Sequence, residues 1–180
     1  KIQEYGIEHV YTSFPEGRIR KETIEIGGKS AKELEKEMKK KGINVSDYAK
    51  YMIESKDFTT LKKSEPEDLV RLKVGDLGFP KDKNPTTDEV YKRIEELGLE
   101  LCPAETGPQL CLKYADQPLN EWVRIGMKQI ADRSGDPDVF NLTRNDGGLW
   151  LNSRWTNPEY RWDTDNEFVF RLRKLKNLKT

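Results

Sequence analysis

The chain has 180 residues and a formal net charge of zero, because 32 Lys and Arg are balanced by 32 Asp and Glu. Hydrophobic residues make up 34% and charged residues 36%, against roughly 45–50% and 25% in an average soluble domain. No apolar run approaches the roughly 20 residues that a membrane-spanning helix needs. One His and two Cys are too few for a Cys/His zinc cluster, so we expect no membrane span, no metal site and no cofactor.

The start of the sequence, KIQEYGIEHVYTSF, contains no hydrophobic segment of a secretory signal. Because the numbering begins at Lys1 rather than at Met, a leader removed beforehand stays an open alternative. The default expectation is a cytoplasmic protein. Four Trp, seven Tyr and six Phe supply enough aromatic side chains for a folded core.

The N-terminal part predicts short strands followed by two helices. Residues 1–29 contain short alternating stretches that favour two or three strands. Ser30 and Glu33 then have the spacing of a capping box, which predicts a helix start. A second, shorter helix is predicted after Ser46. Residues 59–68 are polar, charged and contain a proline, and therefore predict a loop.

The rest of the chain predicts one more helix and then strands. Residues 69–74 predict a strand, and a third helix begins after Thr86 and ends at Gly98. Short apolar stretches separated by turn residues predict the later strands. These strands are expected over residues 99–102, 109–114, 121–130, 139–144, 149–155 and 167–173.

Together these elements predict an α+β fold, with short N-terminal strands and two helices, then a helix leading into a strongly bent antiparallel sheet or small barrel. We expect a small α+β unit over residues 1–75 and a β-rich unit with one leading helix over residues 76–180. The two units are expected to pack together, because about 75 residues alone bury little core.

Three familiar motifs fit the sequence poorly. A phosphate-binding loop before Lys29 and Ser30 would need a glycine where Thr23 stands, so a helix cap explains Ser30 without a nucleotide. A DNA-reading helix that begins after Ser46 would present Asp47 to the phosphates. A calcium loop over 132–138 would have its glycine at the wrong position.

The sequence offers little that indicates catalysis. The only histidine, His9, has no serine or cysteine nucleophile close to it in sequence. With 32 acidic residues, a pair of carboxylates acting in a hydrolase stays an open alternative. The sequence therefore leaves any catalytic residues unknown. If the protein is an enzyme, we expect a concave pocket that contains acidic side chains with raised pKa values.

Aromatic and basic residues instead indicate a binding surface on the predicted sheet. Arginine beside tryptophan suits stacking on bases or sugars, or the anchoring of a protein partner. Cross-strand pairs that cover a half-exposed sheet would leave the same pattern. The favoured interpretation is a non-catalytic binding or interaction module with a protein or a nucleic acid as its partner. Its candidate surface residues are Trp122, Arg124, Lys128, Trp150, Arg171 and Arg173.

The two cysteines suggest a strand register. Pairing Cys102 with Cys111 in a hairpin sets Leu101 opposite Leu112 and makes one face apolar. Directly opposed residues lie close to disulfide distance. In a reducing compartment we expect two free thiols on the outward face.

The stretch from Thr87 to Arg173, with the segments DEVYKRIEELGLELCPAETGPQL, EWVRIGM, GLWL and EFVFRLRK, resembles small bacterial proteins that carry no assigned activity. The resemblance covers about half of the chain. It implies no catalytic residues, cofactor or partner.

Overall fold

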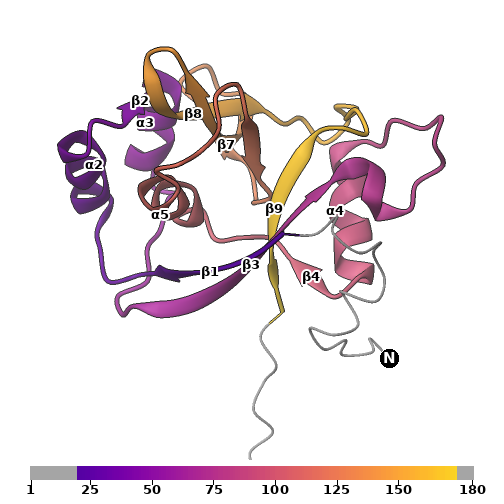
Figure 1. Ribbon diagram of the computed structural model, residues 1–180, viewed down its shortest axis with the longest axis horizontal. Helices are drawn as coiled ribbons and strands as arrows, with labels where there is room; N and C mark the ends of the chain where they lie inside the picture. Colours follow the sequence, from indigo (N-terminus) through magenta and orange to yellow (C-terminus); the bar gives the residue numbers. More distant parts are fainter. Residues whose placement is uncertain (1–19, 174–180) are drawn as a thin grey trace, which may run out of the picture.

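The computed structural model describes residues 20–173 (Figure 1). The strands predicted before residue 20, and His9 with them, lie outside this range. Within it, the helical elements are α2 (Ala31–Lys40), α3 (Asp47–Glu54), the 3-10 turn η1 (Val74–Leu77), α4 (Thr87–Glu96) and α5 (Thr106–Lys113). The strands are β1 (Arg20–Ile26), β2 (Asn44–Val45), β3 (Glu65–Lys73), β4 (Leu99–Glu100), β5 (Trp122–Ile125), β6 (Ile130–Ala131), β7 (Pro137–Asn145), β8 (Gly148–Trp155) and β9 (Glu167–Leu172). No described helix has the length and apolar character that crossing a membrane requires.

The nine described strands form one open sheet in the order β1-β3-β9-β5-β7-β8-β2, with β4 added to β9 and β6 to β7. The mixed α and β content confirms the broad fold class. The antiparallel sheet is wrong, because β5 and β9 pair in parallel, as do β2 and β8. The small barrel is wrong as well, because the strand order runs from β1 at one edge to β2 at the other without closing. Strand β9 lies between β3 and β5 and so joins the N-terminal strands to the later ones. The domain boundary at residue 75 stays a prediction.

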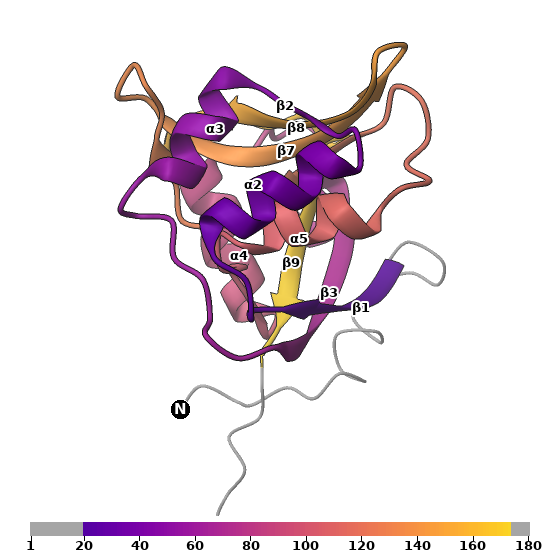
Figure 2. The same ribbon diagram turned by 90° about the vertical axis from the view of Figure 1, so that its left-hand side faces the viewer.

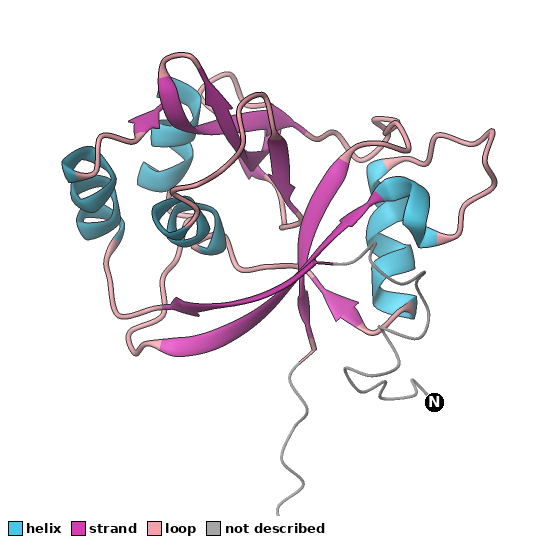
Figure 3. Cartoon of the chain, viewed as in Figure 1, coloured by secondary structure: helices cyan, strands magenta, loops and turns pink. Residues whose placement is uncertain are grey.

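The sheet bends around helix α5, and both of its sides are covered (Figures 1 and 2). Helices α2, α3 and α5 lie on the concave side, between the β1–β3 arm and the β7–β8 arm, whereas α4 lies on the convex side (Figure 3). The concave core contains Leu110 and Leu142. A second cluster on the convex side contains Ile94, Phe168 and Phe170.

Because a core lies on each side of the sheet, both sets of alternating side chains along a central strand can be buried. Arg124 of β5 pairs with Phe168 of β9, and Ile125 pairs with Val169. Paired residues point to the same face of a sheet, so Ile125 and Val169 are concave whereas Arg124 and Phe168 are convex. The sequence interpretation assumed a single buried face and therefore placed Arg171 beside Arg124. Arg171 lies on the opposite face, because it has the same parity as Val169 along β9.

The predicted helix starts are confirmed. In each case a side-chain hydroxyl accepts a hydrogen bond of 3.1–3.2 Å from the backbone N–H three residues later, Ser30 from Glu33, Ser46 from Ala49 and Thr86 from Glu89. The loop predicted over 59–68 is wrong at its end, since β3 begins at Glu65 and pairs there with Ile26. Residues 65–68 form a strand despite their polar sequence, because β1 provides hydrogen-bonding partners for their backbone.

The strand predicted over 109–114 is wrong, because this segment belongs to helix α5. A short apolar run does not distinguish a buried strand from a buried helix, and the residues from Gln109 to Leu112 are all buried. Pro108 is tolerated because the first-turn N–H groups of a helix lack intrahelical partners. At Gly107, a Cβ atom would lie 2.7 Å from Cδ2 of Phe140, so only glycine lets the helix approach β7 this closely.

The predicted cysteine hairpin is therefore wrong as well. Cys111 lies on α5, whereas Cys102 forms an isolated bridge with Met127. Both thiols are free, but they are buried rather than outward-facing. Burial raises the pKa of Cys111 to about 12 and that of Cys102 well above its usual value.

Candidate functional site

The candidate site is a polar and aromatic surface on the convex side of β5, β7 and β8, beside the part that α4 covers. Two rows of directly paired residues run across these strands, Trp122–Thr143–Trp150 and Arg124–Asn141–Asn152. Arg154 of β8 lies on the same face, paired with Val139. We call this surface the polar convex face, and it consists of Trp122, Arg124, Asn141, Thr143, Trp150, Asn152 and Arg154.

Two arginines of this face share one indole ring. The guanidinium carbon of Arg124 lies 5.2 Å from the ring centroid of Trp162, and that of Arg154 lies 6.0 Å from the same centroid. Arg154 also donates a 2.8 Å hydrogen bond from Nη2 to the hydroxyl of Tyr160. Such contacts between cations and aromatic rings are attractive, but they leave both positive charges in place.

The arginine pair has no acidic partner among the described residues. No carboxylate there forms an ion pair with either guanidinium, and both Nε atoms are buried without a hydrogen-bond partner. Burial and, next, the charge of Arg154 lower the pKa of Arg124 to about 10. The side-chain oxygen of the adjacent Asn141 is also buried without a partner. The face thus combines two positive charges that have no ion-pair partner among the described residues with an unused acceptor, and the charges of Glu167 and Asp163 offset that of Arg124 only in part.

Aromatic rings connect the arginine pair to solvent. The rings contact each other in the order Phe170, Phe168, Trp162, Tyr160 and Trp155, with centroid distances of 5.7, 4.9, 4.7 and 5.6 Å. Trp162 is fully buried, whereas Trp155 is 45% exposed and Trp122 is 54% exposed. The exposed indoles offer planar surface at the edges of the polar convex face.

The structure brings together only half of the residues predicted from sequence. Trp122, Arg124 and Trp150 share the polar convex face, but the expectation that Arg124 is exposed is wrong, because only 7% of it is accessible. Lys128 is exposed in the loop between β5 and β6. Arg171 and Arg173 both bind Glu100, at 3.1 and 3.5 Å, and so have a local carboxylate partner.

Sequence reasoning missed four members of the polar convex face, and it also missed Tyr160 and Trp162, which pack against its arginines. The four are Asn141, Thr143, Asn152 and Arg154. The strand predicted over 149–155 carries Trp150, Asn152 and Arg154 at every second position, and this alternation could have identified Arg154. No sequence pattern points to Asn141, because it belongs to the site only through its pairing with Arg124 on the neighbouring strand. Tyr160 and Trp162 follow β8 in a segment without periodicity, and only the folded chain places them over the arginines.

Two buried acids flank the turn between β6 and β7, Asp132 at its start and Asp138 in β7. One oxygen of Asp132 accepts backbone hydrogen bonds from Ser134 at 2.7 Å and Asp136 at 3.1 Å, which is a turn-stabilising arrangement. Burial first, and then the negative charge of Asp132, raise the pKa of Asp138 to about 6. Within the described residues, no cluster of three His, Cys, Asp or Glu has the geometry of a metal site.

No protein-family model, no curated protein and no solved structure matches this chain. Any statement about its function therefore rests on the geometry of the site itself.

Proposed function

We propose that this protein is a non-catalytic binding module. Its polar convex face would bind a ligand that carries both negative charge and planar groups. The observation that carries the proposal is the arginine pair, in which Arg124 and Arg154 lie over one indole and neither is bonded to a carboxylate. Two like charges held close together repel each other. A ligand that brings negative charge relieves this repulsion and supplies the missing counter-charge.

Single-stranded nucleic acid is the ligand class that best matches this surface. Its phosphates would interact with the guanidinium groups, and its bases would stack on the exposed rings of Trp122 and Trp155. Stacking of a base on an aromatic side chain contributes about 1–3 kcal/mol and tolerates any base. The zero net charge of the chain predicts modest affinity that falls with added salt. An acidic segment of a protein is the other partner class that the charges allow.

The test is a titration of fluorescently labelled single-stranded oligonucleotides of twelve residues, followed by anisotropy at low salt. Arg154→Gln is expected to weaken binding at least fivefold, and Trp122→Ala a similar amount. The matched control is Arg133→Gln, which removes an exposed arginine from the β6–β7 turn and should bind as the wild type does. Equal affinities of the Arg154 and Arg133 variants would refute the proposed face.

A parallel titration with a poly-glutamate peptide distinguishes the two partner classes. Peptide binding that depends on Arg154, without oligonucleotide binding, would refute nucleic acid as the ligand and assign the face to an acidic protein. The hydrolase alternative has the raised pKa of Asp138 in its favour. However, Asp138 does not line the cavity between α5 and the sheet, whose acids are Glu22, which is partly exposed, and Asp116, which is exposed.

A further inference from the structure

A separate cavity of about 240 Å³ lies on the concave side, where helix α5 ends and the sheet continues beyond it. Four adjacent strands supply its apolar floor with one side chain each, namely Leu69, Val123, Leu142 and Val169, and α5 contributes Leu110. A cavity of about 150 Å³ accommodates benzene, so this one has room for roughly ten non-hydrogen atoms. The apolar part of a small molecule fits against this floor.

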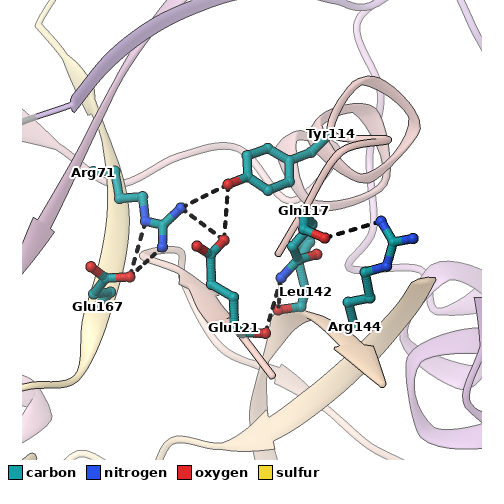
Figure 4. A network of polar contacts seen from close by, with 7 residues as sticks. All are labelled: Arg71, Tyr114, Gln117, Glu121, Leu142, Arg144 and Glu167. Atoms are coloured by element: carbon teal, nitrogen blue, oxygen red, sulfur yellow. Dashed lines mark hydrogen bonds and ion pairs between the residues drawn. The ribbon is translucent and has the colours of Figure 1, made fainter. Parts of the chain in front are cut away.

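One wall of the cavity is a fixed polar network (Figure 4). Arg71 donates from Nη1 to the hydroxyl of Tyr114 at 3.2 Å and to Glu121 at 3.0 Å, and its Nε and Nη2 both donate to Glu167. Tyr114 in turn donates to Glu121 at 2.9 Å. Burial alone would lower the pKa of Arg71, but the bonds to Glu121 and Glu167 raise it above its usual value. Arg71 and Tyr114 therefore hold their positions before any ligand arrives.

The turn that follows α5 is also fixed in place (Figure 4). Gln117 donates from Nε2 to the backbone oxygen of Glu121 at 3.1 Å and to that of Leu142 at 3.0 Å. Arg144 donates to the backbone oxygen of Gln117 at 3.1 Å. These bonds attach the turn to β5 and β7, so the cavity is preformed, as small-molecule sites usually are.

The solvent side of the cavity carries charges of both signs. Lys21 and Glu22 come from β1, where Glu22 pairs with Leu69 and shares its face, whereas Lys21 pairs with Val70 on the other face and borders only the rim. Lys113 and Asp116 come from the end of α5 and the turn after it. Among the described residues, none of the four forms an ion pair or a side-chain hydrogen bond. A ligand that carries both an ammonium and a carboxylate beside its apolar part is complementary to this set.

We infer that the cavity binds a small apolar zwitterion of the size and chemistry of a free hydrophobic amino acid. Its hydrocarbon side chain packs on Leu110, Val123 and Leu142, its carboxylate faces Lys113, and its ammonium faces Glu22 and Asp116. Exposed ion pairs are weak, so most of the binding free energy should come from the apolar contact. We expect a dissociation constant of about 1 mM or tighter. This site is independent of the polar convex face.

The experiment titrates the full chain with three compounds that share a phenyl ring, L-phenylalanine, 3-phenylpropionate and phenethylamine, and follows backbone amide shifts by NMR. L-phenylalanine should bind at least fivefold more tightly than either singly charged compound, with shifts at residues 110–114 and at Val123. Equal or tighter binding of 3-phenylpropionate or phenethylamine, or no saturable binding of L-phenylalanine, would overturn the inference.

Variants locate the binding. Lys113→Glu should weaken L-phenylalanine at least threefold, whereas the matched control Lys92→Glu, on the exposed side of α4, should leave it unchanged. Val123→Phe fills the cavity and should abolish binding. If the Val123→Phe variant does not fold, the variant at the exposed Lys113 still tests the site. Arg154→Gln should bind L-phenylalanine normally, which separates this site from the proposed function. Equal affinities of the Lys113 and Lys92 variants would refute the site.

Discussion

Replacing Asp138 with asparagine should stabilise the protein at neutral pH. Only 3% of Asp138 is exposed, and its Oδ1 atom is buried without a hydrogen-bond partner among the described residues. Its carboxyl group interacts with Ser153 and lies beside the negative charge of Asp132. Asparagine keeps the shape and the acceptor for Ser153, removes the charge, and offers an N–H group to Asp132.

The size of the effect follows from the pKa of Asp138, which is raised from 3.8 to about 6. Between these two values the folded protein holds a proton that the unfolded chain has released, so the free energy of unfolding falls as pH rises through this window. At about 1.4 kcal/mol per pKa unit, the full shift sets an upper limit of about 3 kcal/mol. Partial relaxation around the charge lowers the expected gain of the variant to about 1–2 kcal/mol.

Urea denaturation followed by circular dichroism at pH 3.5 and pH 7.5 measures this difference. Asp138→Asn should gain about 1–2 kcal/mol over the wild type at pH 7.5 and should match it at pH 3.5, where Asp138 is protonated. Asp136→Asn, at an exposed position of the turn before β7, is the control; Asp136 makes only a minor contribution to the raised pKa of Asp138, so this variant should change little at either pH. A variant that is less stable than the wild type at pH 7.5 would refute the reasoning.

Two further substitutions and one labelling experiment test the packing. Gly126→Ala places a Cβ atom 2.1 Å from Cε1 of Phe170 and should cost about 1–3 kcal/mol in urea denaturation; an unchanged midpoint would contradict this packing. Arg124→Ala removes a buried side chain and its stacking contact, so we expect a loss of about 1–3 kcal/mol, where an exposed arginine would cost within about 0.5 kcal/mol. Cys102 and Cys111 should not react with a thiol reagent such as DTNB until the protein unfolds, because both are buried; rapid labelling of the native protein would argue against this burial.

The helix starts could be predicted from sequence because they depend on neighbours three residues apart. Ser30 and Glu33 satisfy each other's backbone groups whatever the rest of the chain does. The residues from 109 to 112 were mispredicted for the opposite reason, since a short buried run takes its conformation from what it packs against. Helix α5 fits there because Gly107 allows close approach to Phe140.

The candidate site was predictable only in part, because it depends on how strands face one another. The alternation in β5 correctly placed Trp122 and Arg124 on the face opposite to Val123, although Arg124 is buried there. The relative orientation of β5 and β9 is set by their parallel pairing, which no local pattern records. The assignment of Arg171 to the same surface as Arg124 failed for that reason.

The central position of β9 has a consequence for synthesis on the ribosome. Of all described strands, β9 is translated last, yet it lies between β3 and β5 in the sheet. Until residues 167–172 leave the exit tunnel, β3 and β5 each present an unpaired edge, and such edges are prone to associate with other chains. Domains generally fold as units during synthesis, but here the β1–β3 and β5–β7–β8 parts of the sheet stay unconnected by strand pairing until the final described strand arrives. A nascent chain stalled before residue 167 should therefore need chaperone protection, whereas one extended well past residue 172 should not.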